Sequence, residues 1–161
     1  MTKPDPSCLI CRGIAGDAEF QRVEVWQDSL WRFTVSLAAE VPGFAYLEPK
    51  RHIPDIAQLD GEEAATFGPV MAKVTAALKA ETGAELVYVY IFGGGIPHLH
   101  VHLAPHRAGD ALNEQMVRGE LTSEKLPSGI EMFVSREFPA LPQNTLAEVA
   151  RRVGRRLAYP E

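Results

Sequence analysis

The stretch PHLHVHLAPH, residues 97–106, carries four of the five histidines of this 161-residue chain. In an extended strand alternate side chains share a face, so His98, His100 and His102 are predicted to line one side of it. The apolar residues between them would then line the other side. Imidazole titrates near neutral pH and can act as nucleophile, acid, base or metal ligand. The stretch therefore predicts a chemically active strand, with a solvent-facing strand or a pure metal site as the alternatives.

Length and composition indicate one globular domain, with 46% hydrophobic and 23% charged residues. No apolar run approaches the roughly 20 residues that span a bilayer, and the N-terminal residues lack the apolar region of a signal peptide. We therefore expect a cytoplasmic protein with no membrane partner. The formal net charge of −5 argues against broad binding to polymeric nucleic acid, although local dipoles can still hold a small anion.

The two cysteines, Cys8 and Cys11, form a Cys-x-x-Cys pair. In a reducing compartment such a pair is more often a metal clip or a redox site than a structural disulfide. A redox pair is expected at the start of a helix after a strand, and only a polar tail precedes this one. The metal interpretation is favoured, and two thiolates need two more ligands to complete a tetrahedron. The candidates are His52 and one of the three alternating histidines.

The first two thirds of the chain predict a sheet and one long helix. The helix begins at Asp60, which forms a capping box with Glu63, and ends at Gly83. Pro69 lies inside it and is expected to kink or split it, because proline removes a backbone hydrogen bond. The alternation of apolar residues predicts strands at 23–27, 31–35, 44–48 and 86–92, the last of them central in the sheet.

The remaining third shows a looser pattern: a polar segment around residues 113–122, a strand at 130–135 and a proline-rich linker at 138–142. A final helix is expected from Thr145, with Glu148 completing a second capping box. Its arginine-bearing face is either solvated or a phosphate-binding patch. Its apolar stripe must pack on its own sheet or on a neighbouring subunit, and we expect it to reinforce a homodimer.

Three consecutive glycines, Gly93, Gly94 and Gly95, precede the histidines. Such a run can direct backbone N–H groups at an anion without obstruction by side chains. A tight turn between two strands is the alternative interpretation. Beside the histidines the phosphate interpretation gains support, because a neutral imidazole can attack phosphorus.

The motif of residues 98–104, His-Leu-His-Val-His-Leu-Ala, resembles the signature of the histidine triad (HIT) superfamily, and in particular its zinc-binding, hydrolase-like branch. The Cys-x-x-Cys pair, the segment PKRHI at 49–53 and the long helix agree with this resemblance. It implies an α+β fold with an antiparallel sheet of about five strands, a long helix and a C-terminal helical extension. The expected boundaries are a HIT-like core at 1–108 and an extension at 109–161 that packs on it.

The resemblance also implies an enzyme that attacks the α-phosphate of a nucleoside phosphoramidate or a dinucleoside polyphosphate, usually as a homodimer. His100 would form a nucleotidyl-histidine intermediate, and His102 would contact the phosphate and assist the leaving group. In the zinc-binding members the corresponding residues hold a structural Zn²⁺; here they are Cys8, Cys11, His52 and His98.

Two positions depart from the family pattern. Ser36 stands where relatives commonly carry an acidic residue that holds the ribose hydroxyls, and it is kept as a substrate-binding candidate with the three glycines. The run from Gly94 to Pro97 lacks the Ser, Thr or Gln that contacts the leaving group in many relatives. The sequence therefore does not define the nucleobase, the leaving group or the molecule that accepts the nucleotidyl group from the histidine. The alternative functions are a non-catalytic nucleotide-binding protein and a zinc-dependent interaction module.

Overall fold

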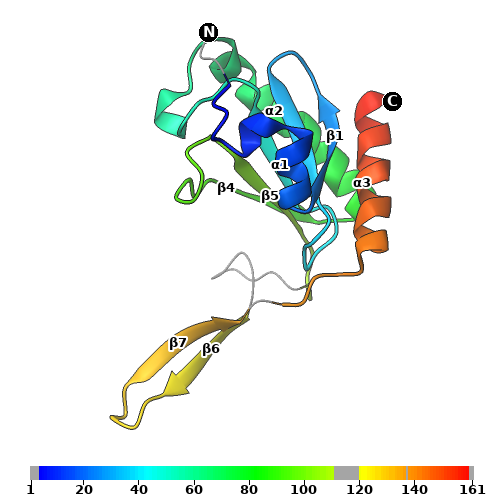
Figure 1. Cartoon of the computed structure of the whole chain (residues 1–161). Coiled ribbons are helices and arrows are strands. Elements are labelled where there is room, and N and C mark those ends of the chain that lie inside the picture. Colours follow the sequence, from blue (N-terminus) through cyan, green and yellow to red (C-terminus); the bar gives the residue numbers. More distant parts are fainter. Residues whose placement is uncertain (1–3, 111–119, 137, 160–161) are drawn as a thin grey trace.

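The computed structural model describes residues 4–110, 120–136 and 138–159 and has the expected α+β architecture (Figure 1). At its centre is a five-stranded antiparallel sheet in the order β1-β2-β3-β5-β4. Its strands are β1 (Arg22–Gln27), β2 (Trp31–Ser36), β3 (Ala45–Pro49), β4 (Leu86–Tyr90) and β5 (Val101–His106). The helices are α1 (Ile14–Glu19), α2 (Gly61–Thr82) and α3 (Gln143–Ala158), with 3-10 turns η1 (Ile10–Arg12) and η2 (Ile56–Gln58).

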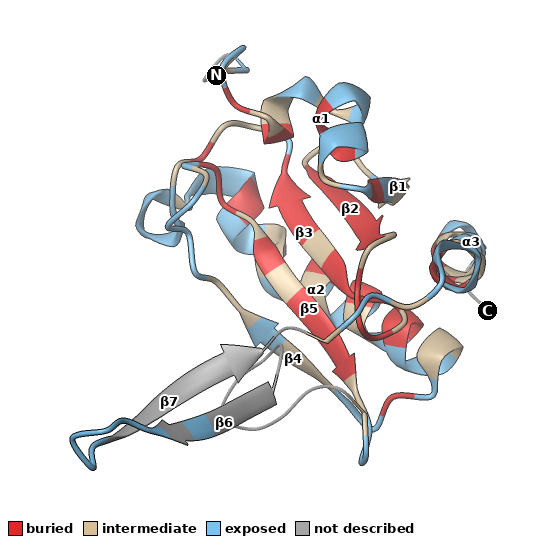
Figure 2. Cartoon of the chain, turned by 60° about the horizontal axis from the view of Figure 1, so that its bottom comes forward, coloured by how far each residue is buried: buried red, intermediate tan, exposed pale blue. Residues whose placement is uncertain are grey.

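The sheet has one apolar and one polar face, because side chains alternate along each strand. Trp31, Phe33 and Leu47 point to the apolar face and are fully buried in the core that α2 and α3 cover. The opposite face carries charged residues of β1, β2 and β3 and the candidate histidine His102 of β5. Figure 2 shows that β2, β3 and most of β5 are buried. The side chains on the polar face are therefore positioned by the buried core on the other face of the sheet.

Helix α2 is one uninterrupted element of 22 residues, so Pro69 does not split it. Pro69 lies on the exposed side of the helix, where water can satisfy the carbonyl that loses its partner. The predicted capping box is wrong: Asp60 makes no side-chain cap, and Arg51 binds the carboxylates of both Asp60 and Glu63. The predicted end at Gly83 is confirmed, with a left-handed φ of 69°.

Strand β4 was expected in the middle of the sheet, and that prediction is wrong. It lies at the edge and pairs only with β5 within this sheet. Leu86 and Val89 are 43% and 46% exposed, whereas Val101 and Leu103 of β5 are fully buried. An apolar run shows that a segment can be a strand, but long-range pairing decides which strand is inside.

Helix α3 packs on α2, β1 and β2 of its own chain. Its apolar stripe belongs to the main core: Leu146, Val149, Ala150, Val153 and Leu157 are buried. The helix begins at Gln143 rather than Thr145, without a side-chain cap, and Glu148 pairs with Arg151, so the second capping box is also wrong.

Strands β6 (Glu120–Lys125) and β7 (Glu131–Arg136) form a separate hairpin that projects from the core (Figure 1). The predicted strand at 130–135 corresponds to β7. Most of the predicted polar segment, residues 113–119, lies outside the described residues. None of the helices in the described ranges combines the length and apolar character that crossing a membrane requires.

Candidate functional site

The three alternating histidines do not share one outward face, which corrects the sequence-based expectation. Strand β5 begins at Val101, so His98 and His100 precede it and only His102 lies within it. His98 is 1% exposed and turns into the protein. The backbone N–H of Leu99 donates to the Ile53 carbonyl at 2.6 Å, which draws this segment towards the loop after β3. This pairing cannot be read from local periodicity.

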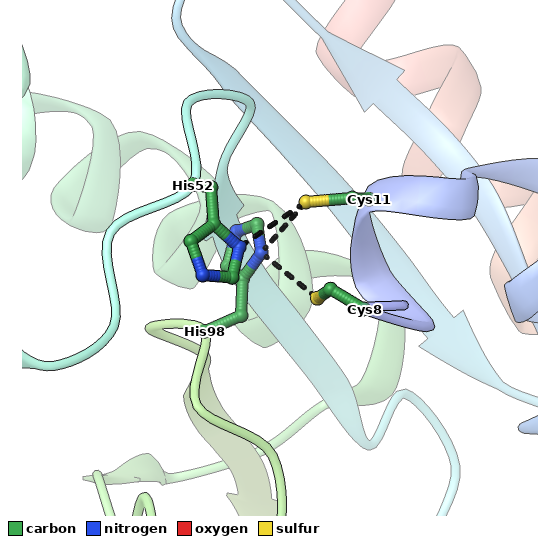
Figure 3. A group of neighbouring side chains, drawn as sticks. All are labelled: Cys8, Cys11, His52 and His98. Carbon is green, nitrogen blue, oxygen red and sulfur yellow. Dashed lines mark hydrogen bonds between the residues drawn. The ribbon is translucent and has the colours of Figure 1, made fainter. Parts of the chain in front are cut away.

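The four predicted metal ligands converge at one end of the sheet (Figure 3). Their donor atoms all lie within 4.8 Å of one another, although Cys8 and His98 are 90 residues apart in sequence. The His98 Nδ1 lies 3.4 Å from both cysteine sulfurs, and His52 Nδ1 lies 3.3 Å from Cys11 Sγ. Ligand atoms around a tetrahedral zinc are separated by roughly 3.3–3.8 Å, given Zn–S of about 2.3 Å and Zn–N of about 2.0 Å. The residues therefore fit a tetrahedral metal ion.

The protonation state of His98 also suits metal binding. His98 Nε2 lies 2.9 Å from the Pro49 carbonyl, which can only accept, so Nε2 carries the proton and Nδ1 offers its lone pair. Burial lowers the pKa of His98 to about 4, which keeps the imidazole neutral near pH 7. Burial likewise raises the pKa of the Cys11 thiol to about 11 in the metal-free chain. A bound cation would have to displace that thiol proton.

His100 has the opposite exposure and a different backbone partner. Its Nδ1 lies 2.6 Å from the carbonyl oxygen of His98, so Nδ1–H donates and Nε2 keeps its lone pair. Its ring is partly exposed, and its centroid is 5.2 Å from that of His102. The backbone thus selects the His100 tautomer that has a nucleophilic Nε2.

His102 sits among aromatic side chains. Tyr46 of β3 and Tyr90 of β4 are its cross-strand partners, with ring centroids 5.2 and 4.7 Å away. Phe92 adds a further contact at 5.8 Å. These rings restrict the imidazole to one orientation beside His100.

His100 and His102 line a cavity on the polar face of the sheet, beside η1 and the residue that follows α1. Its other walls are Ile10, Phe20, Arg22, Tyr46 and Ile96. Gly93, Gly94 and Gly95 are exposed and are not among these lining residues. Ser36 is also absent from the lining: it is buried, and its Oγ accepts a hydrogen bond from the Ala38 N–H. The structure therefore brings the two histidines together at a cavity, with the serine and glycines outside its walls.

A buried charged cluster beneath this cavity was not predicted. Asp17, Arg22, Arg32 and Glu48 are each at most 7% exposed. Arg22 donates to Asp17 and to both oxygens of Glu48, while Arg32 donates to Asp17, Glu48 and Glu24. Complete burial raises the pKa of Glu48, and the two guanidinium charges oppose that rise. Charged residues inside otherwise apolar strand patterns were the signal in the sequence that could have revealed the cluster.

Comparison with known sequences places this site in a family context. The profile of the family described as HIT domain matches residues 18–109. An uncharacterised HIT-like protein of Mycobacterium tuberculosis is 25% identical over 111 residues, which cover 66% of this chain and 76% of that protein. The nitrilase and fragile histidine triad fusion protein NitFhit of Caenorhabditis elegans is 26% identical over 123 residues. That alignment covers 70% of this chain but only 28% of the fusion protein.

Solved structures share the fold at lower identity. A Zn-bound histidine triad family protein from Mycobacterium smegmatis superposes with a TM-score of 0.64 at 22% identity, covering 94% of each chain. A hypothetical histidine triad nucleotide-binding protein from Sulfolobus tokodaii gives 0.65 at 18% identity, covering 94% of this chain and 92% of the other. Both alignments extend well beyond residues 18–109, so the C-terminal part of the chain also has counterparts in these folds.

Proposed function

Since the chain belongs to the HIT domain family, we propose that it is a nucleotide-phosphate hydrolase or transferase with His100 as its nucleophile. The observation that carries the proposal is the hydrogen bond from His100 Nδ1–H to the His98 carbonyl. It leaves a lone pair on Nε2 in a cavity that also contains His102. The proposed substrates are nucleoside phosphoramidates or dinucleoside polyphosphates.

In the first step, His100 Nε2 attacks the α-phosphorus, a P–N bond forms, and the bond from phosphorus to the leaving group breaks. His102 contacts the phosphate and supplies the proton that an amine leaving group needs, whereas a nucleoside phosphate can leave as an anion. In the second step, water attacks the same phosphorus while it gives a proton to His102, which replaces the proton lost in the first step, and the P–N bond breaks. The nucleoside monophosphate leaves and His100 returns neutral. Phosphate in place of water would give the transferase reaction.

Zinc is the metal proposed for the cluster of Cys8, Cys11, His52 and His98. Two thiolates and two imidazoles are the donors of closed structural zinc sites. All four positions are then filled by protein, so no site remains for a reactive water. The ion would fix the segment before β5 to the N-terminal turn and thereby place His100.

A homodimer completes the proposal. Strand β4 has a free edge in the five-stranded sheet, and Leu86 and Val89 leave apolar surface on it. Exposed edge strands of this kind are commonly covered by pairing. Pairing of two β4 edges would put the two cavities in one continuous sheet.

The test is single-turnover release from a panel of adenylylated and guanylylated phosphoramidates and dinucleoside polyphosphates, with and without added phosphate. We expect release of the leaving group and a nucleotide bound covalently to the protein by a bond that is labile in acid. Nucleotide binding without turnover would favour the non-catalytic alternative. Metal-stripped protein that stays folded and still turns over would exclude zinc-dependent interaction as the sole function.

A further inference from the structure

Arg22 differs from the other described residues of the buried charged cluster because it also lines the cavity of His100 and His102. Arg32, the second arginine of the cluster, is bound to the same carboxylates but is not among the lining residues. Arg22 is thus the described residue of the cluster that reaches the cavity.

The donors of Arg22 are only partly used. Its Nε donates to Asp17 at 2.8 Å, and its two terminal nitrogens donate to Glu48 at 2.5 and 3.1 Å. These bonds take three of the five N–H donors of the guanidinium. The ends of the group are clamped by two carboxylates, so the remaining N–H donors are fixed in direction before a ligand arrives. Preorganised donors of this kind contribute to affinity with little loss of entropy.

The charge balance selects the kind of ligand group. Arg22 and Arg32 face three carboxylates, those of Asp17, Glu24 and Glu48. Even if Glu48 is protonated, the charges of Asp17 and Glu24 balance those of the two arginines. A further anion would gain no net attraction there, whereas an uncharged oxygen or nitrogen acceptor could accept from the N–H groups that Asp17 and Glu48 do not engage.

The position of Arg22 indicates which part of the substrate it meets. Its guanidinium carbon lies 5.4 Å from the centre of the Tyr46 ring, and that ring lies 5.2 Å from the His102 ring. A phosphate at the histidines would therefore place its nucleoside alongside Arg22. Phe20, 4.8 Å from the same guanidinium carbon, and Ile10 provide the apolar surface that a nucleoside needs.

We infer that Arg22 is a specificity-determining residue that donates hydrogen bonds to an uncharged acceptor on the nucleoside part of the substrate. The inference rests on the proposed function, since it takes the phosphate to lie at the histidines. Arg22 is the cross-strand partner of Ser36, which offers no carboxylate on this face of the sheet. The acceptor is either a ribose oxygen or a nucleobase atom, and both have the same chemistry.

The protein side of the test compares Arg22→Lys with Arg32→Lys. Both changes keep a positive charge in the same buried cluster, and only the first alters the cavity wall. Binding of AMP and GMP is measured by calorimetry on variants whose thermal unfolding is still cooperative. We expect Arg22→Lys to raise the Kd roughly tenfold, the loss expected for one or two hydrogen bonds. Arg32→Lys should leave the Kd within about twofold of the parent.

The ligand side compares nucleotide analogues, first on the unaltered protein, where no variant has to fold, and then on Arg22→Lys. The 2′-deoxy and 3′-deoxy monophosphates remove ribose acceptors, and 7-deaza purine monophosphates remove a base acceptor. One of these analogues should bind the unaltered protein roughly tenfold more weakly than the unmodified nucleotide does. In Arg22→Lys the same analogue and the unmodified nucleotide should bind equally well. The sensitive analogue identifies ribose or base as the acceptor. Adenosine 3′,5′-bisphosphate should gain no affinity through Arg22.

Three results would overturn the inference: equal effects of the two lysine variants, analogue penalties that persist in Arg22→Lys, or tighter binding of the bisphosphate that depends on Arg22. Failure of the proposed function looks different. If the protein binds nucleotides through Arg22 but shows no turnover, the proposed catalytic function is wrong and the inference about Arg22 stands. If it shows turnover but the two lysine variants bind nucleotides equally well, the catalytic function stands and the inference about Arg22 is wrong.

Discussion

His100 and His98 have the same side chain and different proposed roles, and hydrogen bonds to backbone carbonyls distinguish the two rings. The His98 carbonyl receives the Nδ1–H of His100, and the Pro49 carbonyl receives the Nε2–H of His98. Each contact fixes a tautomer, so one imidazole presents Nε2 to the cavity and the other presents Nδ1 to the cysteines. Chemistry at this scale is decided by which nitrogen is left without a proton.

Replacing His100 by Asn should abolish the covalent step and leave nucleotide binding within about threefold of the parent, since the other cavity walls remain. Rapid-quench assays measure the chemistry and calorimetry measures the binding. His102→Asn serves as the comparison: its rate loss should grow as the leaving group becomes more basic. A loss of binding in His100→Asn with unchanged chemistry per bound substrate would contradict the assignment.

Zinc uptake should be coupled to protons. Above pH 4 His98 is neutral, whereas Cys11, with a pKa of about 11, keeps its proton in the metal-free chain. Binding must expel that proton, so zinc affinity should rise with pH between 6 and 8 and fall as pH decreases. Titration of metal-free protein in weak buffer with a pH indicator measures the release. Cys11→Ala should release about one proton fewer and bind zinc more weakly, and pH-independent affinity would exclude a thiolate ligand.

At the scale of elements, two helical glycines show the difference between a helix surface and a helix contact. Gly68 of α2 has no atom within 4 Å of the position that a Cβ would take. Gly154 of α3 faces β1, where an added Cβ would lie 3.0 Å from the Val25 carbonyl oxygen. The absence of a side chain at Gly154 is what lets α3 approach the sheet so closely.

Alanine at the two glycines should have different effects on the free energy of unfolding. Gly68→Ala should change it by less than about 1 kcal/mol, because the helix preference of alanine is offset by the clash of its Cβ with the following Pro69 in the helical conformation. Gly154→Ala should destabilise it by about 1–3 kcal/mol, because α3 must shift away from β1. Urea unfolding monitored by circular dichroism measures both, and stabilisation by both variants would show that α3 packs less tightly than described.

The edge strand is the element expected to control assembly. Val89→Lys places a charge on exposed β4 and should dissociate the proposed homodimer with little change in thermal stability of the subunit. Sedimentation velocity at low micromolar concentration measures the change. Glu85→Lys, just outside β4, is a charge control that should remain dimeric. A Val89→Lys protein that is still a dimer would place the interface elsewhere.

For the whole molecule, α3 completes the core under the candidate site. Its buried side chains pack beneath the sheet whose other face carries His102 and Arg22. Deleting residues 139–161 should therefore abolish cooperative thermal unfolding, because the apolar face of the sheet would be left open to water. Leu146→Ala, which leaves a cavity, should cost about 2–5 kcal/mol. Arg155→Ala on the exposed face is the control, and a stably folded truncated chain would contradict this account.

Local patterns in the sequence determined much of this protein. Alternation predicted the strands to within one or two residues at most ends, and Gly83 predicted the end of α2 because glycine readily adopts the left-handed conformation that commonly closes a helix. The spacing of the cysteines and histidines indicated a metal clip at Cys8 and Cys11 and reactive imidazoles at 98–102, and the resemblance to the HIT superfamily implied the full metal cluster and the roles of His100 and His102. These features depend on neighbours a few residues apart, which a sequence displays directly.

Tertiary structure alone decided which strand lies at the edge, which histidine turns inward and which charges are buried. Strand β4 is apolar yet lies outside β5, and the partners of His98 come from the last residue of β3 and from the N-terminal segment. Arg22 and Glu48 are 26 residues apart and meet only because three strands align in register. The physical reason is that pairing and desolvation act between segments distant in sequence, and their outcome is fixed only when the whole core assembles.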